Sequence, residues 1–155
     1  MKQRDVVSMT DAEVTAMLGG SRKVQMATIN PDGSVHLVTM FYAMVGAEMA
    51  FWTYRASQKA RNLARDPRIT CLVEDGTDYF ELRGVQIAGV VRCVSDPAEV
   101  LAIGRLIAGG MAGGVAGGDA ALEEYVTNAA RKRLGYFVEP RRIVSWDHRK
   151  LVRAG

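Results

Sequence analysis

The stretch MAFWTYRASQKARNLARDPR occupies residues 49–68. The run 49–54 is rich in apolar and aromatic residues and predicts a β-strand. Ser57 is a residue type that begins helices, and Pro67 marks the point at which a helix ends. The sequence therefore predicts a strand that leads into a short basic helix. The amino end of that helix is expected close to the end of the strand.

The beginning of this helix has the properties of an anion site. Free backbone N–H groups and the helix dipole attract negative charge, and Arg55, Lys59 and Arg61 add cationic side chains. The pattern predicts a bound phosphate group, and hence an anionic cofactor or substrate. Two alternatives stay open. In the first, Lys59 and Arg61 are ordinary solvated charges of a surface helix. In the second, Arg65 interacts with the carboxyl end of the helix, where cations are favoured.

The segments before this stretch predict one helix followed by strands. Residues 10–13 (Thr-Asp-Ala-Glu) fit a capping box, and the helix that they begin ends at Gly19-Gly20. Strands are expected over residues 24–29 and 35–45, joined by a turn at residues 30–33. Further strands are expected over residues 69–74 and 79–94. The apolar phase of the last strand shifts at Gly84, which predicts a β-bulge there.

The carboxyl-terminal third predicts two helices and two closing strands. Asp96-Pro97 begins a helix that runs to about residue 108, a glycine-rich segment follows, and residues 119–133 form another helix. Closing strands are expected over residues 134–138 and 142–146. The order predicts a single mainly β domain over residues 1–155, a closed antiparallel barrel with peripheral helices. A doubly wound fold is rejected because strands and helices do not alternate.

Composition narrows the function classes. The 20 basic and 17 acidic residues leave a net charge of +3, too small for a general nucleic-acid binder. Residues 106–118, the longest uncharged run, are too few to span a membrane. The amino-terminal residues lead into no apolar segment, so a cytoplasmic protein is expected. No metal-ligand cluster or Ser-His-Asp pattern is evident. Cys71 and Cys93 are expected as buried free thiols, with a disulfide only between neighbouring strands.

Two strands are apolar on both faces, namely residues 35–42 and residues 50–52. A small barrel buries only the inward face of each strand. The outward apolar residues need another cover, and a homodimer is the economical one.

Several motifs together resemble a known family. They are residues 27–34 (ATINPDGS), 51–53 (FWT), 57–68 (SQKARNLARDPR), 81–85 (ELRGV) and 145–151 (SWDHRKL). Their order over nearly the whole chain is similar to that of the flavin/deazaflavin oxidoreductases. These are the actinobacterial, F420-using branch of the pyridoxamine 5′-phosphate oxidase-like split-barrel superfamily.

The resemblance implies a split antiparallel β-barrel of the FMN-binding type, assembled as a homodimer with two cofactor sites at its interface. It implies that one strand lines the cofactor ring, that the next strand adjoins it, and that the basic helix binds the phosphate and tail. The partner subunit would close the site. The residues implied for the strand that lines the ring are Val38, Thr39, Met40 and Phe41, and those for the adjoining strand are Trp52, Thr53 and Tyr54. Those implied for the phosphate and tail are Ser57, Lys59, Arg61 and Asn62. Tyr79 and Trp146 are the residues implied for the partner subunit.

Two cofactors compete, F420 and FMN. The FMN-using oxidases of the superfamily carry an Arg-x-Val-Leu-Leu-Lys strand, whereas residues 35–42 contain no Arg or Lys. This difference argues against oxidation of pyridoxamine phosphate. F420 is more anionic than FMN, because it carries a phosphodiester and a polyglutamate tail. A groove with several cations suits that tail and favours F420; the cations are Arg55, Lys59, Arg61, Arg65 and Arg68.

The expected function is that of a reductase that uses reduced F420 to reduce an electron-poor acceptor, such as an enone, quinone or tetrapyrrole. The alternatives are an FMN-dependent oxidoreductase and a non-catalytic F420-binding carrier. The sequence identifies neither the acceptor nor a catalytic residue. Tyr42, Tyr79 and Tyr136 are proton-donor candidates that it does not rank. His36 and His148 are expected as structural hydrogen-bonding residues, with catalysis by His36 as the alternative. Residues 109–118 are expected as a mobile loop, either over the substrate or as a surface insertion. Trp52 and Trp146 are alternatively core or interface residues, and the methionines at 40, 44 and 49 are expected to fill the core.

Overall fold

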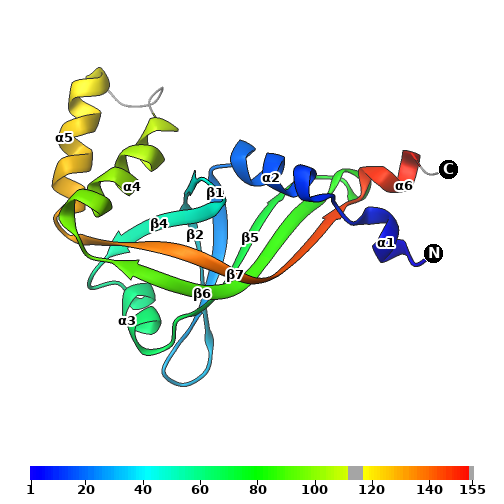
Figure 1. Cartoon of the computed structure of the whole chain (residues 1–155), viewed down its shortest axis with the longest axis horizontal. Coiled ribbons are helices and arrows are strands. Elements are labelled where there is room, and N and C mark those ends of the chain that lie inside the picture. Colours follow the sequence, from blue (N-terminus) through cyan, green and yellow to red (C-terminus); the bar gives the residue numbers. More distant parts are fainter. Residues whose placement is uncertain (112–116, 154–155) are drawn as a thin grey trace.

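A computed structural model describes residues 1–111 and 117–153, and one antiparallel sheet forms its centre (Figure 1). The sheet has the order β2-β1-β5-β6-β7-β4-β3. Its strands are β1 (Lys23–Ile29), β2 (Val35–Phe41), β3 (Ala43–Val45), β4 (Glu48–Tyr54), β5 (Arg68–Asp75), β6 (Arg83–Val94) and β7 (Arg133–Asp147). The helices are α1 (Gln3–Val7), α2 (Asp11–Gly20), α3 (Gln58–Arg65), α4 (Pro97–Gly109), α5 (Gly118–Ala130) and α6 (Arg149–Arg153), with a short 3₁₀ turn η1 (Tyr79–Glu81).

The sheet curls into a split barrel, which confirms the predicted fold class. Its two edge strands, β2 and β3, are consecutive in the chain, and no pairing between them is present in the described residues. The expectation of a closed barrel is therefore corrected to an open one. The predicted strand over residues 35–45 is also interrupted. Tyr42 lies between β2 and β3 and belongs to neither strand. Its hydroxyl donates a hydrogen bond to the Leu18 carbonyl, and its backbone N–H donates one to the Arg22 carbonyl.

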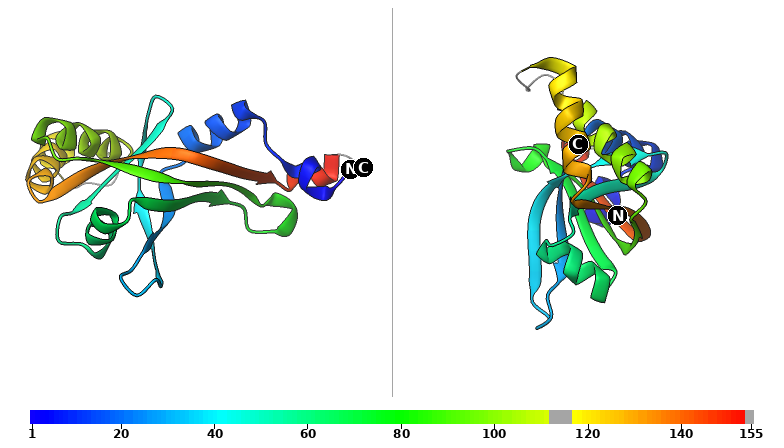
Figure 2. Two further views of the ribbon diagram at one scale, coloured as in Figure 1. Left: turned by 60° about the horizontal axis from the view of Figure 1, so that its bottom comes forward. Right: turned by 90° about the vertical axis from the view of Figure 1, so that its left-hand side faces the viewer.

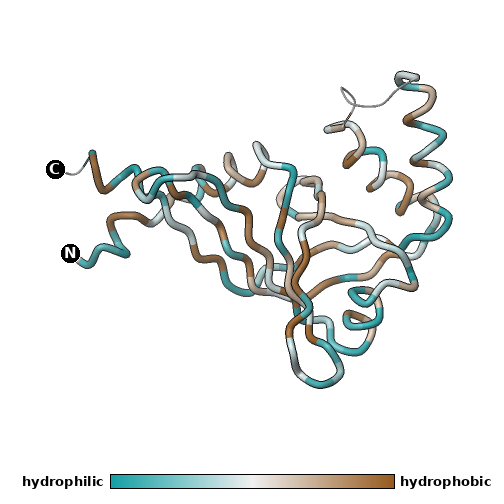
Figure 3. Tube along the Cα trace, turned by 180° about the vertical axis from the view of Figure 1, so that it is seen from behind, coloured by the Kyte–Doolittle hydropathy of each residue, from teal (hydrophilic) through white to brown (hydrophobic). Residues whose placement is uncertain are grey.

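The capping predictions are confirmed. Thr10 and Glu13 form the capping box of α2, and the Asp96 side chain accepts a hydrogen bond from the Glu99 N–H at the start of α4. The turn between β1 and β2 is also where it was expected, and Gly33 there has a φ of 84°. Figure 3 shows the hydrophilic tip of this hairpin and the hydrophobic stretches on either side of it.

The longest strand pair differs from the prediction in three places. Residues 79–81 form the turn η1, so β6 begins only at Arg83. The register shift lies between Ala88 and Gly89 instead of at Gly84. Strand β7 continues through Pro140 as one strand, because the irregularity at Gly89 accommodates the proline opposite it. Gly84 has another role. A Cβ there would lie 2.2 Å from the Trp146 ring, so the glycine lets the tryptophan pack on the strand.

The main core fills the inside of the curled sheet. Phe51 and Tyr136 stack there with ring centroids 5.0 Å apart, and both side chains are at most 2% exposed. Met49 belongs to this core, with Met40 and Met44 packed against it. The three methionines therefore contribute to the core, as expected.

Helices α4 and α5 cover the outer side of the sheet at one end, away from the chain termini (Figures 1 and 2). Ala50 of β4 is buried against Ile103 and Ile107 of α4, with Trp52 packed beside them. The cover over residues 50–52 therefore comes from the same chain. A second subunit is not needed for these residues, which corrects part of the argument for a homodimer.

Strand β2 is different because no other part of the described chain covers its outward apolar residues. Val35, Leu37 and Phe41 are 63%, 69% and 44% exposed, and they alternate along the strand so that they share one face. The expectation of a homodimer therefore rests on this exposed apolar face of β2.

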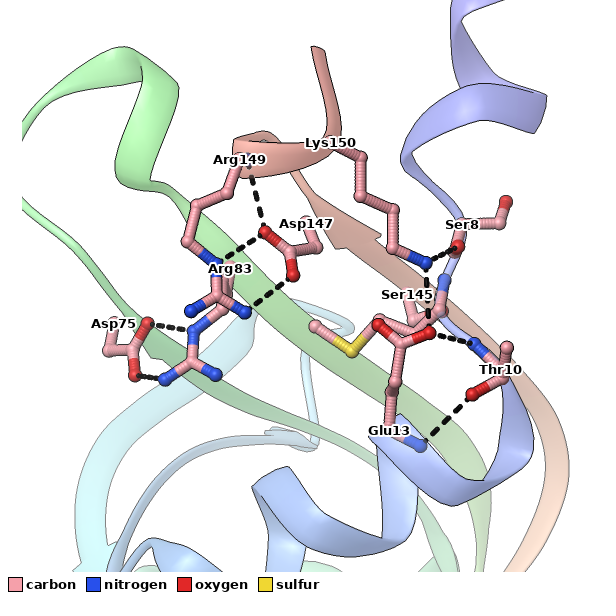
Figure 4. Close-up of polar contacts among 10 residues, drawn as sticks. Ser8, Thr10, Glu13, Asp75, Arg83, Ser145, Asp147, Arg149 and Lys150 are labelled. Atoms are coloured by element: carbon pink, nitrogen blue, oxygen red, sulfur yellow. Dashed lines mark hydrogen bonds and ion pairs between the residues drawn. The ribbon is translucent and has the colours of Figure 1, made fainter. Parts of the chain in front are cut away.

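A polar cluster joins the two ends of the chain at the opposite end of the sheet (Figure 4). The Asp147 carboxylate is buried and accepts hydrogen bonds from the Arg149 backbone and guanidinium, and the neighbouring Arg83 pairs with Asp75. Lys150 donates to Glu13 at 2.9 Å, which ties α6 to α2. The hydrogen bonds from Arg149 are the largest reason why the pKa of Asp147 lies below its ordinary value.

We expect Asp147→Asn to lower the free energy of unfolding by about 1–2 kcal/mol at neutral pH, because a charge-assisted hydrogen-bond pair is lost. A lowered folded-state pKa stabilises the fold above the unfolded-state pKa. The difference from wild type should therefore shrink as the pH falls below 3.8. Urea unfolding at several pH values measures this. Asp78→Asn, an exposed carboxylate, is the control, and a pH-independent difference would contradict the explanation.

The two cysteines differ in their exposure to solvent. Cys71 and Cys93 are both free thiols, but Cys93 is exposed, which corrects its expected burial.

Among the described residues, no helix is long and apolar enough to cross a membrane. Residues 112–116 of the expected glycine-rich loop lie outside the described residues.

Candidate functional site

The basic helix α3 begins next to the end of β4, as the sequence predicted. Ser57 is its N-cap, and the Ser57 Oγ accepts a hydrogen bond from the Ala60 N–H at 3.1 Å. The Thr53 hydroxyl of β4 donates to the same oxygen at 3.3 Å. These contacts hold the helix start against the strand, so that Lys59 in the first turn lies beside the strand end.

Asn62 fixes the other side of α3. Its side chain is 0% exposed. Its Nδ2 donates to Thr28 Oγ1 at 3.0 Å and to Asn30 Oδ1 at 2.9 Å, while its Oδ1 accepts from Gln58 Nε2 at 2.8 Å. The amide is thus occupied within the protein and cannot contact a ligand directly. Its role as a direct phosphate ligand is corrected to that of a residue that positions the helix.

A groove of about 390 Å³ lies between the strand ends and helices α4 and α5. Its size is within the range of small-molecule sites. Seven of the residues that the sequence singled out line it: Thr39, Met40, Phe41, Trp52, Thr53, Tyr54 and Lys59. The two strands and the basic helix therefore meet at one place, as expected for a cofactor site.

Several other residues singled out from the sequence do not line this groove. Val38 packs toward the core, and Ser57 supports the helix start behind Lys59. Arg61 is exposed on α3. Tyr79 and Trp146 belong to η1 and to the end of β7, in the region of α6, where the Tyr79 carbonyl contacts His148. Neither of them lines the groove of its own chain.

Lys59 is a cation that the groove partly encloses. Burial lowers the pKa of its ammonium group, and within the described residues no carboxylate pairs with it. A half-buried cation without a counter-ion carries an uncompensated desolvation cost. A bound anionic group would relieve that cost, so Lys59 fits the phosphate of an anionic cofactor.

The other basic residues of this segment divide into two groups. Arg65 donates to the Ile29 carbonyl of β1, and Arg68 forms an ion pair with Asp66 at 2.7 Å. The Asp66–Arg68 hydrogen bonds lower the pKa of Asp66 to about 2. Arg65 and Arg68 each have a partner within the protein, and neither lines the groove. This corrects the expectation that all the basic residues of the segment face one anionic tail.

The roof of the groove was missed by reasoning from the sequence. Helices α4 and α5 and the turn after α4 supply mainly apolar residues there, and β7 supplies Arg133. The residues are Gly104, Ile107, Ala108, Met111, Leu122, Tyr125, Val126 and Arg133. Gly104 carried a usable signal, because it is a glycine within a helix. A Cβ at this position would lie 2.3 Å from the Trp52 ring, so the missing side chain lets α4 pack on the tryptophan.

The fold is a split barrel, and its groove has aromatic walls and two cations, Lys59 and Arg133, an arrangement that suits an anionic cofactor with a flat ring. The family model of pyridoxamine 5′-phosphate oxidase matches residues 10–108, and the chain belongs to this family. At the family level the cofactor is of the flavin type. None of the curated proteins matches the chain.

Solved structures with the same fold cover most of the chain. A conserved hypothetical protein from Mycobacterium tuberculosis is 39% identical, with a TM-score of 0.87 over 98% of this chain and 93% of that one. An F420 reductase is 22% identical, with a TM-score of 0.63 over 83% of this chain and 93% of that one. A FAD-binding protein from Mesorhizobium loti is 14% identical, with a TM-score of 0.66 over 89% and 94%. The last two show the fold alone.

Proposed function

We propose that this protein is an F420-dependent reductase of the pyridoxamine 5′-phosphate oxidase family. The observation that carries the proposal is the groove that joins two strand ends to the start of a basic helix, with Lys59 partly buried in it and unpaired among the described residues. When bound, reduced F420 supplies a hydride from its deazaflavin ring, and an electron-poor acceptor takes up that hydride together with a proton from solvent.

The residues of the groove would divide the binding between them. Lys59 holds the phosphate group, with backbone N–H groups at the start of α3 beside it. The strand segments 39–41 and 52–54 give the ring a flat wall, to which the Trp52 and Tyr54 side chains contribute. The apolar residues of α4 and α5 exclude water above it, which strengthens polar contacts inside the groove.

F420 fits these residues better than FMN for two reasons. Strand β2 carries no Arg or Lys that would pair with the phosphate of FMN, as the FMN-using oxidases of the superfamily do. Arg55 and Arg61 are exposed and flank Lys59 in the sequence, so they could follow an extended anionic tail. An F420 reductase shares the fold, which is consistent with this choice.

The proposal includes a homodimer in which the partner subunit closes the groove. The exposed face of β2 formed by Val35, Leu37 and Phe41 supplies an apolar contact surface. Phe41 also lines the groove, so a subunit placed on this face would reach the cofactor site. Tyr79 and Trp146, which are distant from the groove in their own chain, remain the proposed contribution of the partner.

Parallel titrations of the purified protein with F420 and FMN test the proposal. We expect F420 to bind at least tenfold more tightly than FMN, because its phosphodiester and tail offer more charge-assisted contacts. Oxidation of reduced F420 is then followed with enones, quinones and tetrapyrroles. Tighter binding of FMN, or a yellow protein as purified, would favour an FMN-dependent oxidoreductase. F420 binding without turnover on any acceptor would favour a carrier.

A further inference from the structure

Arg133 occupies an unusual position at the end of the groove. Its guanidinium lies 4.0 Å from the centroid of the Tyr54 ring and 4.9 Å from that of the Trp52 ring. One of its nitrogens donates to the Ala129 carbonyl at 3.0 Å. Two aromatic faces and one carbonyl thus fix the plane of a partly buried guanidinium. The side chain is pre-organised for a ligand that binds in this plane.

Most of the donors of Arg133 remain free. A guanidinium has five N–H donors in a fixed fork, and in residues 1–111 and 117–153 Arg133 makes that one hydrogen bond and no ion pair. A carboxylate matches the remaining geometry, since its two oxygens accept parallel N–H bonds.

A second hollow adjoins the groove at the same residue. It has a volume of about 350 Å³ and shares Tyr54, Tyr125 and Arg133 with the groove. Arg131 and Lys132 line it as well, and neither hollow is lined by Asp or Glu. We call Arg131, Lys132 and Arg133 the basic corner. The residues that line the groove are thus mostly apolar, whereas those that line the adjoining hollow are partly cationic.

Lys59 and Arg133 both line the groove, but they come from different elements. Lys59 lies on α3 and Arg133 begins β7, while β4 supplies the aromatic residues beside them. One anionic group on the cofactor satisfies Lys59. The basic corner offers a place for a separate anionic group, and the aromatic and apolar side chains beside it suit a group attached to an apolar body.

We propose that the basic corner binds a carboxylate of the acceptor, and that the protein reduces apolar, unsaturated carboxylic acids in preference to their neutral counterparts. This inference rests on the proposed function and adds the substrate class to it. Arg133 supplies the bidentate contact, and Arg131 and Lys132 add a positive potential at the outer end. The apolar roof residues contact the body of the acceptor.

The test compares trans-cinnamate with methyl cinnamate, which have the same ring and double bond but differ in charge. Binding is measured by calorimetry, with the protein alone and with the protein saturated with oxidised F420. We expect wild type to bind the acid about tenfold more tightly than the ester, and Arg133→Gln to remove this preference. Arg133→Lys, which keeps the charge but loses the planar fork, should restore only part of it.

Two controls separate this proposal from its alternatives. Arg142→Gln removes an exposed cation elsewhere on β7 and should leave both affinities unchanged. Titration with a deazaflavin riboside that lacks the glutamate tail tests whether the basic corner holds the cofactor instead. If Arg133→Gln weakens F420 but neither the tailless compound nor cinnamate, the acceptor proposal is wrong.

The outcomes also distinguish this inference from the proposed function. Equal affinity of wild type for acid and ester overturns the inference, whatever the cofactor. A preference for the acid that Arg133→Gln abolishes in the protein alone supports the carboxylate site even if F420 does not bind. In that case the failure belongs to the proposed function.

Discussion

Lys59→Ala is expected to weaken F420 binding by about tenfold to one hundredfold, which is the scale of losing one charge-assisted phosphate contact. The side chain lines the groove and lacks a carboxylate partner among the described residues. Its removal relieves a desolvated cation, so the free energy of unfolding of the cofactor-free protein should not fall. Fluorescence titration measures the affinity, and urea unfolding measures the stability.

Lys23→Ala is the matched control for this change. Lys23 is an exposed lysine at the start of β1 and does not line the groove, so its removal should leave the F420 affinity unchanged. If Lys59→Ala and wild type bind F420 equally well, Lys59 is an ordinary half-buried surface charge. If both variants weaken binding to the same degree, net charge explains the effect and Lys59 makes no specific contact.

Gly89→Ala is expected to cause the largest loss of stability, about 2–3 kcal/mol. A Cβ at this position would lie 2.1 Å from the carbonyl oxygen of Glu139 and 3.0 Å from its carbon. Both are backbone atoms of the neighbouring strand β7, so no side-chain rotation relieves the contact. The two longest strands would have to separate where their register shifts.

Thermal and urea unfolding measure this effect, and Gly19→Ala provides the control. Gly19 lies in α2, and a Cβ there would meet nothing within 4 Å. Alanine is favoured over glycine in helices, so this change should be neutral or slightly stabilising. A loss of less than about 0.5 kcal/mol for Gly89→Ala would mean that the strands adjust at the bulge without cost.

Local signals predicted most elements correctly. Thr10, Ser57 and Asp96 each begin a helix, because a capping side chain acts on backbone N–H groups only a few residues away. The failures occurred where the partner of a residue is distant in the sequence. Tyr42 interrupts the expected strand because its hydroxyl reaches the end of α2, and the bulge follows Pro140, which lies opposite Gly89.

The residues of the candidate site also differ in whether their neighbours in the fold are close or distant in the sequence. The aromatic strand and the basic helix predicted the position of the groove, because Trp52, Thr53 and Lys59 are close neighbours in the chain. The apolar roof and Arg133 could not be predicted in this way. Arg133 reaches Trp52 and Tyr54 only because β7 pairs with β4.

The sequence by itself determined that the chain is mainly β and that a capped basic helix follows the aromatic strand, because these properties depend on residue types and their near neighbours. Only the tertiary structure decided which cations are available to a ligand. Lys59 lines the groove, whereas Arg65 and Arg68 have partners within the protein. The physical reason is that the curl of the sheet and the pairing of its strands set the direction in which each side chain points. Short-range patterns in a sequence do not encode that direction.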